Sequence, residues 1–216
     1  MIVYGSSLSP FVRKVLAFGA EKGLELEHRP LGLGATDPDF IEASPFRKIP
    51  GFQDGDFKIC DSSAIVHYLE AKFPEPVLIP HAPEPRARTI WYEEFGDTIL
   101  MACGAKMFFN RVVAPRFLGR EGDLAAADKA EKEELPPILD YLERVAPEGE
   151  GFLVGDSITL ADIAVASPFA NLSYIGVTVD EGRYPKAKAY VDRMLARPSF
   201  APWVERERDF LAKTAA

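Results

Sequence analysis

The chain has 216 residues, 47% hydrophobic and 27% charged, and a formal net charge of −8 at pH 7. This length and composition are those of a soluble globular protein with one or two domains. The negative charge argues against nucleic acid or an anionic membrane as a partner, because their phosphates would repel it. No apolar run reaches the length of a membrane span and no charged-then-apolar leader precedes Ile2, so we expect a cytoplasmic protein.

Cysteine and histidine usage indicates neither a disulfide framework nor a metal site. The two cysteines, Cys60 and Cys103, form no Cys-x-x-Cys motif, and the three histidines lack the spacing of metal ligands. We therefore expect no metal in this protein.

The N-terminal third alternates short strands with helices. Periodicity and turn residues predict strands over 2–4, 25–30, 51–53 and 57–60, and helices over 10–22, 37–42 and 62–73. The sequence Asp54-Gly55-Asp56 between the last two strands is a tight hairpin signal. The order β-α-β-α-β-β-α combines a parallel crossover with an antiparallel hairpin, which is typical of a thioredoxin-like domain.

A proline-rich segment and a helical region follow. Residues 74–85 hold five prolines, too closely spaced for a helix or an inner strand, and we interpret them as a linker. The chain beyond is permissive for helices over 87–113, 124–145, 159–174, 184–196 and 200–210, with a break near the proline pair 136–137. We predict an α/β domain at 1–73, the linker at 74–85 and an all-α bundle at 86–216.

One helix of this bundle has a clear N-terminal capping motif in its sequence. Thr159 and Asp162 have the spacing of a capping box, and Ile158 and Ile163 are placed to pack as a hydrophobic staple. Loss of a helix cap destabilises a protein by about 1 kcal/mol. We expect this motif to be structural and to take no part in chemistry.

The most informative stretch of the chain is Tyr4–Arg13, which reads Tyr-Gly-Ser-Ser-Leu-Ser-Pro-Phe-Val-Arg. A strand stops at Gly5 and a helix begins at Pro10, whose fixed φ and missing amide proton suit the first helical position. Ser9 then occupies the N-cap, with its hydroxyl at the positive end of the helix dipole. Such a turn can bind an anion, although Ser-Pro at a helix start is by itself ordinary.

Two further segments make an anion site more specific: Arg47-Lys48-Ile49-Pro50 and Asp61-Ser62-Ser63-Ala64-Ile65. The first adds two cations to Arg13 and Lys14 on an otherwise acidic chain, and this local reversal of charge suits an anionic ligand. For Arg13 and Lys14 we expect ordinary solvated positions on the surface.

With these residues the chain resembles the glutathione S-transferases over nearly its whole length. The segments that carry the resemblance, at 9–15, 44–50, 61–65 and 157–163, read Ser-Pro-Phe-Val-Arg-Lys-Val, Ser-Pro-Phe-Arg-Lys-Ile-Pro, Asp-Ser-Ser-Ala-Ile and Ser-Ile-Thr-Leu-Ala-Asp-Ile. The first three are similar to the glutathione site of the serine-type classes, closest to the plant tau class and bacterial relatives. The resemblance implies a dimeric, cytosolic enzyme that binds glutathione on a thioredoxin-like domain.

The resemblance also implies individual roles. Ser9 matches the catalytic serine that donates a hydrogen bond to the glutathione sulfur. Lys48 matches a lysine that reaches the glycyl carboxylate, and the backbone of Ile49 would pair with the cysteinyl amide. Pro50 matches the cis-proline of the family.

The γ-glutamyl group is assigned to Asp61 and Ser62, although the family usually has glutamate at the first of these positions. For the thiol itself three alternatives to Ser9 stay open. Ser6 and Ser7 lie in the same turn, and Tyr4 occupies the strand-end position that tyrosine-type classes use. We favour Ser9 over the two serines and place Tyr4 last.

The implied activity is a glutathione transferase that adds the glutathione thiolate to a hydrophobic electrophile, a reaction of detoxification with glutathione as co-substrate. A non-catalytic regulator or docking protein of the same fold is the main alternative, and a glutathione-dependent peroxidase or isomerase is another. Candidate side chains for the electrophile site are Met101, Phe108, Phe109 and Phe117, although aromatic residues at helical spacing are more often core. The implied homodimer would meet at the helices around Tyr68 and Trp91.

Overall fold

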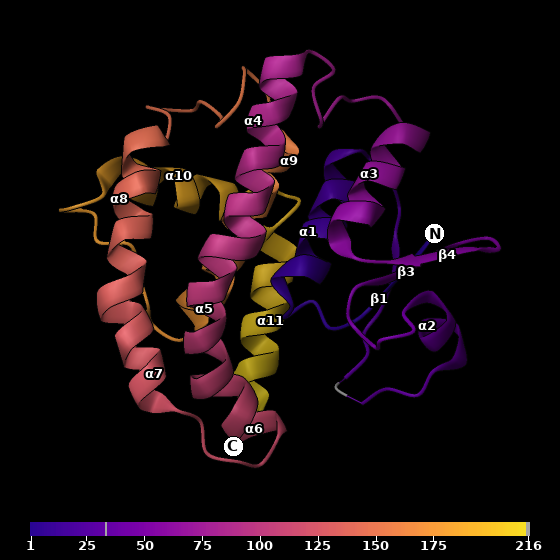
Figure 1. Ribbon diagram of the computed structural model, residues 1–216, viewed down its shortest axis with the longest axis horizontal. Helices are drawn as coiled ribbons and strands as arrows, with labels where there is room; N and C mark the ends of the chain where they lie inside the picture. The colour runs from indigo at the N-terminus through magenta and orange to yellow at the C-terminus, as the bar shows by residue number, and fades with distance from the viewer. Residues whose placement is uncertain (33, 215–216) are drawn as a thin grey trace. The chain divides into compact units, whose positions relative to one another are not determined.

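The structure is a computed structural model that describes residues 1–32 and 34–214. The chain divides into two compact units, Met1–Ile79 and Pro80–Ala216 (Figure 1). The first unit is a thioredoxin-like α/β unit and the second is helical, as predicted. Within the described residues, no helix is long and apolar enough to cross a membrane.

The α/β unit follows the predicted order β-α-β-α-β-β-α. Its elements are β1 (Ile2–Tyr4), α1 (Pro10–Glu21), β2 (Glu27–Arg29), α2 (Pro38–Ala43), β3 (Gly51–Asp54), β4 (Phe57–Cys60) and α3 (Ser62–Lys72). The sheet order is β2-β1-β3-β4, with β2 parallel to β1 and the other neighbours antiparallel. The strand predicted over 25–30 is shorter, because only Glu27–Arg29 pair with β1.

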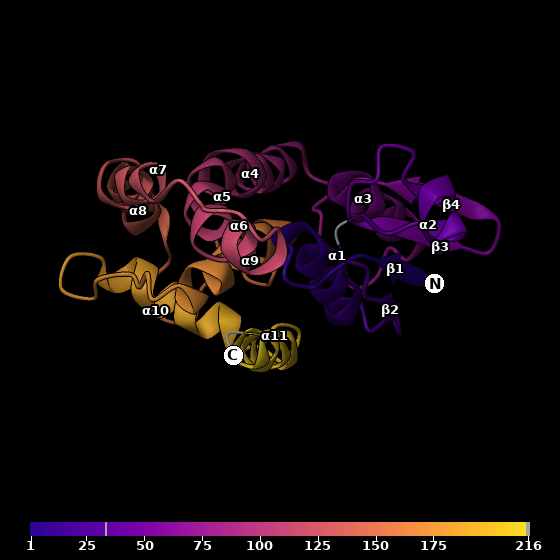
Figure 2. The ribbon, with the colours of Figure 1, turned by 90° about the horizontal axis from the view of Figure 1, so that it is seen from below.

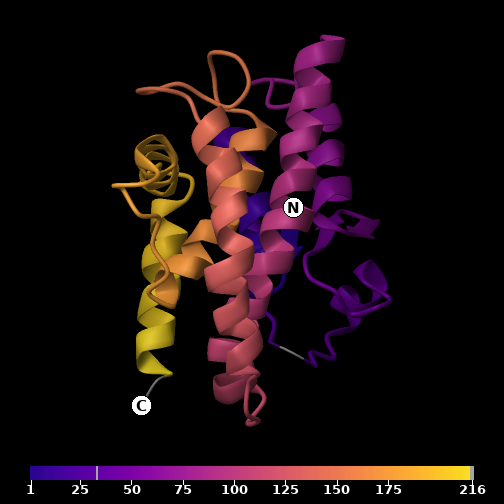
Figure 3. The same cartoon turned by 60° about the vertical axis from the view of Figure 1, so that its left-hand side comes forward.

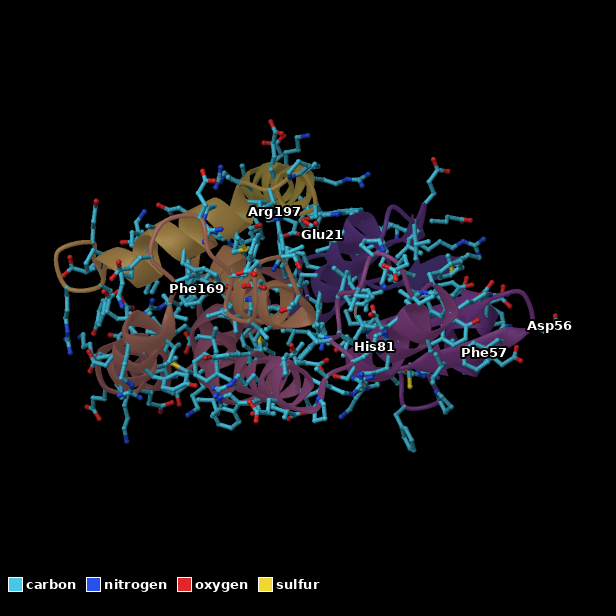
Figure 4. The ribbon with its side chains drawn as sticks, turned by 90° about the horizontal axis from the view of Figure 1, so that it is seen from above. Glu21, Asp56, Phe57, His81, Phe169 and Arg197 are labelled. Carbon is cyan, nitrogen blue, oxygen red and sulfur yellow. The ribbon has the colours of Figure 1, made fainter. Side chains whose placement is uncertain are left out.

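The apolar core of this unit joins the sheet to two helices. Val3 and Phe52 of the sheet are fully buried, as are Phe18 of α1 and Ile65 and Leu69 of α3. The helices α1 and α3 pack against each other and against the sheet, whereas α2 contacts β3 and β4 (Figure 1). The β3–β4 hairpin ends at Asp56 and Phe57, which lie at its outer tip (Figure 4).

A buried ion pair fixes the segment that leaves α3. Lys22 Nζ lies 2.5 Å from Glu70 Oε2, and it also donates to the carbonyl oxygens of Phe73 and Pro76 at 2.7 and 2.6 Å. Glu70 Oε1 accepts from the backbone nitrogens of Leu78 and Ile79, both at 3.1 Å. The ion pair and these backbone bonds together hold the proline-rich segment up to residue 79 against the α/β unit.

The helical unit contains two long helices interrupted by π-helical turns, which Figure 3 shows as continuous rods. The first comprises α4 (Pro83–Glu94), η1 (Phe95–Leu100), α5 (Met101–Phe108), η2 (Phe109–Val113) and α6 (Ala114–Phe117). The second comprises α7 (Leu124–Lys129), η3 (Ala130–Glu134) and α8 (Leu135–Val145). The unit is completed by α9 (Leu160–Tyr174), α10 (Pro185–Leu195) and α11 (Ala201–Lys213), and α10 packs on α8 and α9 (Figure 2).

Two predictions about prolines need correction. The first long helix begins at Pro83, inside the segment that we interpreted as too rich in proline for a helix. Pro83 and Pro85 fall in its first turn, where the missing amide proton has no intrahelical partner to lose. The predicted break at Pro136-Pro137 is instead a change from the π-helical turn η3 to α8, whose first turn holds both prolines.

The helix α9 forms the centre of this unit. All but two of its 15 residues are buried, among them Phe169 (Figure 4). Asp162 is fully buried at its start and accepts hydrogen bonds at 2.9 Å from the backbone nitrogens of Thr159 and Leu153 and from the Tyr190 hydroxyl. The predicted capping box is therefore present, and it also ties α10 and the preceding loop to α9.

Candidate functional site

The sheet register brings the three predicted site segments to the same end of the sheet. Tyr4 at the end of β1 pairs with Gly51 at the start of β3, and Gly51 pairs with Cys60 at the end of β4. The serine-rich turn follows the first of these residues, Ile49-Pro50 precedes the second and Asp61 follows the third. Residues 5–9 thus meet residues 49–50 and Asp61 at the same end of the sheet.

Gly5 makes this meeting possible at the closest point. Its φ is +130°, and a Cβ built there would lie 2.7 Å from Ile49 Cβ and 2.9 Å from Val12 Cγ2. Any other residue would both strain the backbone and push these neighbours apart. The turn that holds the serines therefore packs directly against the residue before Pro50.

Ser9 occupies the N-cap of α1, as predicted, with φ −74° and ψ 123°. Its amide donates to the Ser6 carbonyl and its carbonyl accepts from the Arg13 amide, both at 3.0 Å. Its hydroxyl, however, makes no capping hydrogen bond to the helix. The side chain thus stands at the positive end of α1, and its oxygen accepts no amide hydrogen of the first turn.

The alternatives to Ser9 are placed differently. The Tyr4 hydroxyl donates to Gln53 Oε1 at 2.6 Å, and burial of this side chain raises the pKa of its hydroxyl. The hydroxyl hydrogen of Tyr4 is therefore already used in a hydrogen bond within the sheet. Ser6 Oγ accepts from the Leu8 amide at 3.4 Å, and Ser7 is largely buried.

The loop before β3 is organised by a buried serine. Ser44 Oγ donates to the Lys48 carbonyl at 2.7 Å and accepts from the Lys48 amide at 3.0 Å. These bonds fold the segment so that the Lys48 side chain is exposed to solvent. The Ile49–Pro50 peptide bond is cis, as the resemblance implied.

Asp61 caps α3 and shapes the third segment. Its Oδ1 accepts from the amides of Ser63 and Ala64 at 2.9 and 3.0 Å, which leaves Oδ2 outside both capping bonds. The residue has φ +81°, in the left-handed region that disfavours side chains with a Cβ. Ser62 follows and is 4% exposed, so the two residues combine an exposed carboxylate with an enclosed hydroxyl at a helix N-terminus.

The expectation that Arg13 and Lys14 are solvated is wrong. Arg13 is 0% exposed and Lys14 is 1% exposed. Lys14 Nζ donates to Ser63 Oγ at 3.3 Å, so it reaches from α1 to the Asp61 segment. Charge patterning alone indicates where cations occur in a sequence, and it does not indicate which of them the fold encloses.

In the helical unit, the four candidate side chains for the electrophile site differ in exposure. Phe108 is buried, whereas Phe109 and Phe117 are more than one-third exposed and Phe117 stacks on Phe210. A cavity of about 230 Å³ is lined by Arg116, Tyr174, Arg208, Leu211 and Ala212, and by none of those four. Among the described residues, no cluster of histidine, cysteine and acidic side chains could hold a metal ion.

Comparison with known proteins identifies the family. Residues 3–77 match the model of the glutathione S-transferase N-terminal domain, and residues 111–207 match that of the C-terminal domain. A glutathione S-transferase of Hyoscyamus muticus is 31% identical over 210 residues, which cover 95% of this chain and 98% of that protein. The chain belongs to the glutathione S-transferase family.

Solved members of this family share the fold. A glutathione S-transferase from Rhodospirillum rubrum F11 superposes with a TM-score of 0.84 at 26% identity, covering 94% of this chain and 90% of that one. A glutathione S-transferase I bound with lactoylglutathione gives 0.80 at 25% identity, covering 94% and 98%. One relative carries a different name: a stringent starvation protein A homolog of Haemophilus influenzae is 26% identical over 93% of this chain and 88% of that protein.

Proposed function

We propose that this glutathione S-transferase family member activates the thiol of glutathione and adds it to a hydrophobic electrophile. The observation that carries the proposal is the convergence of the Ser9 turn, Ile49-Pro50 and the Asp61 segment on one edge of the sheet. These segments supply a donor for sulfur, a strand start for a peptide backbone and a carboxylate-hydroxyl pair for an amino acid group.

In this proposal Ser9 holds the sulfur as a thiolate. A thiol with a pKa of about 8.5 is only a few per cent ionised at neutral pH, and lowering this pKa by about two units requires about 2.7 kcal/mol. A hydrogen bond to a charged group contributes about 1.5–3 kcal/mol and a helix N-terminus about 0.3–1 kcal/mol. The Ser9 hydroxyl and the dipole of α1 are together sufficient, and no general base is required.

Groups of opposite charge and a backbone segment would hold the rest of the tripeptide. Lys48 extends from the loop toward solvent and would pair with the glycyl carboxylate. The backbone of Ile49 would pair with the cysteinyl amide. Asp61 Oδ2 would accept from the α-ammonium of the γ-glutamyl group, and the Ser62 hydroxyl would donate to its α-carboxylate. The thiolate then forms a C–S bond to the electrophilic carbon. In a substitution this carbon releases a leaving anion, and in an addition the displaced π electrons take up a proton at the neighbouring atom.

A non-catalytic role in docking or regulation is the second candidate, because one relative is a stringent starvation protein A homolog. Two measurements separate the roles: retention on immobilised glutathione with elution by free glutathione, and conjugation of chlorodinitrobenzene followed by absorbance. We expect both to be positive. Retention on glutathione without conjugation would favour a glutathione-binding protein, or a glutathione-dependent peroxidase if the protein reduces peroxide instead. Failure of both retention and conjugation would favour a docking protein.

A further inference from the structure

A lysine that the proposed chemistry does not use is enclosed beside the glutathione site. Lys14 lies in the second turn of α1, five residues after Ser9, and is 1% exposed. An ammonium group is stable in such a place only where hydrogen bonds replace its hydration. One of these bonds runs from Lys14 Nζ to Ser63 Oγ at 3.3 Å.

The acceptor of this bond belongs to the turn that holds Asp61. The Ser63 amide donates to Asp61 Oδ1 at 2.9 Å, and Asp61 itself has the unfavourable φ of +81°. A backbone conformation of this kind persists where surrounding contacts impose it. The Lys14–Ser63 bond is such a contact, because it ties the turn to the neighbouring helix.

The two helices carry opposite halves of the site. The N-terminus of α1 presents Ser9, and the N-terminus of α3 follows Asp61 and presents Ser62. The helices pack side by side (Figure 1), and Lys14 connects them close to both N-termini. Their relative placement sets the distance between the group that binds sulfur and the pair that binds the γ-glutamyl end.

We propose that Lys14 is a positioning residue of the glutathione site, which holds the Asp61–Ser63 turn at the distance that fits the γ-glutamyl group. The inference rests on the proposed function, because it assigns Lys14 to the same site. Lys14 touches neither the sulfur nor the electrophile in this scheme. It therefore governs affinity for glutathione rather than the reactivity of the bound thiolate.

The experiment compares Lys14→Met, Ser63→Ala and the double variant with the wild type. Binding is measured as Kd for glutathione by calorimetry and as KM and kcat with chlorodinitrobenzene. We expect Lys14→Met to raise Kd and KM about tenfold, the size of one hydrogen bond to a charged group, with kcat at saturating glutathione changed less than about twofold. Ser63→Ala should raise Kd by about threefold or more, and the double variant should be no weaker than Lys14→Met.

Two further variants separate positioning from a general loss of structure. Lys22→Met removes the other buried lysine of the α1 region, at its far end, and should lower the melting temperature without changing Kd. Lys14→Arg keeps a charged donor and should recover part of the affinity lost in Lys14→Met. The pKa of the bound thiol should stay at its wild-type value in Lys14→Met. It is read from the pH dependence of kcat/KM for chlorodinitrobenzene at saturating glutathione.

Three results would overturn the inference: an unchanged Kd in Lys14→Met, multiplicative effects of the two single variants, or a raised thiol pKa in Lys14→Met. The last would assign Lys14 to the thiolate instead. If Lys14→Met does not fold, Ser63→Ala decides the question alone, because a wild-type Kd in this variant removes the proposed link. A wild type that binds no glutathione would overturn the proposed function itself, which is a distinct outcome.

Discussion

At the scale of single residues, the use of each hydrogen-bond donor distinguishes the candidates for thiol activation. The Tyr4 hydroxyl donates to Gln53, whereas the Ser9 hydroxyl makes no bond to the helix that it precedes. An N-cap serine normally stabilises its helix by bonding an amide of the first turn. Because Ser9 Oγ accepts no amide hydrogen of α1, the cap does not fix the orientation of its hydroxyl, which can turn to donate to a ligand at the helix tip.

Replacement of Ser9 by alanine tests this assignment. We expect Ser9→Ala to raise the pKa of bound glutathione by about 1–2 units, since a hydrogen bond to an anion contributes about 1.5–3 kcal/mol. The value of kcat/KM at neutral pH should fall about tenfold to a hundredfold, and the loss should shrink at alkaline pH. The thiolate absorbance of the binary complex measures the pKa directly.

Ser7→Ala and Ser6→Ala are the matched controls, because they remove a hydroxyl from the same turn. Both should keep the wild-type thiol pKa. If either of them raises it while Ser9→Ala does not, the activating hydroxyl is that of the neighbour.

The two cysteines differ in their surroundings, and this difference predicts their reactivity. Burial raises the pKa of Cys103 to about 11, and its Sγ contacts the Ala130 carbonyl. At pH 8 only about 0.1% of such a thiol is ionised. In the native protein we expect fast alkylation of the half-buried Cys60 and slow alkylation of Cys103, with the second rate rising about tenfold per pH unit up to its pKa.

Mass spectrometry of alkylated peptides checks this pattern, and denatured protein provides the reference in which both thiols react. Equal rates in the native protein at pH 8 would contradict the assignment of Cys103 to a closed core position.

At the scale of elements, the start of α9 depends on one buried carboxylate. Asp162 accepts from two backbone amides and from the Tyr190 and Thr159 hydroxyls. Asp162→Ala leaves these donors unpaired in a buried place, and we expect a loss of about 3 kcal/mol or more in the free energy of unfolding. Urea denaturation measures it, and Asp156→Ala, an exposed acid of the same loop, should change stability by less than about 0.5 kcal/mol.

This carboxylate also affects the dependence of stability on pH. Burial raises the pKa of Asp162 above its usual 3.8, against the opposing effect of its hydrogen bonds. The folded state therefore holds this proton more tightly than the unfolded chain does. The resulting contribution is complete below pH 3.8 and is lost as the pH rises through the folded pKa. The stability difference between wild type and Asp162→Ala should accordingly be larger at acidic pH than at pH 7.

At the scale of the whole molecule, apolar side chains remain exposed on the surface of the chain. Phe46, in the loop before β3, is 86% exposed, and Trp91 of α4 is 49% exposed. Contiguous exposed apolar patches mark surfaces that bind a partner, and Phe46 is the most exposed large hydrophobic side chain among the described residues. We propose a second copy of this chain as the partner, in accord with the homodimer that the resemblance implies.

Phe46→Ser tests the homodimer. Sedimentation equilibrium should give a dimer for the wild type and a dissociation constant at least about tenfold higher for the variant, since aromatic anchors carry much of an interface's energy. Phe210→Ser is the control, because Phe210 is also exposed but stacks on Phe117 of its own chain with ring centroids 6.0 Å apart. A monomeric wild type, or equal weakening by both variants, would contradict the role of Phe46.

The sequence alone was sufficient for the order of elements in the α/β unit, for the N-cap position of Ser9 and for the start of α9. These features depend on neighbours within a few residues: a proline at a first turn, a hairpin dipeptide or a threonine and an aspartate three residues apart. The site segments were recognised in the sequence as well, but only through their resemblance to a family. No local pattern placed residues 9, 50 and 62 together.

Three features of that site follow from the folded chain and not from local sequence: which groups lie at the same end of the sheet, which hydroxyls are already hydrogen-bonded and which cations are buried. Lys14 and Lys22 look alike in the sequence, as two lysines of an amphipathic helix region, yet one reaches Ser63 and the other Glu70. Burial and pairing arise from contacts between segments far apart in the chain. A charged side chain that sequence periodicity predicts to be exposed can therefore be buried and connect two helices, because the neighbouring helix supplies the hydrogen bonds that replace water.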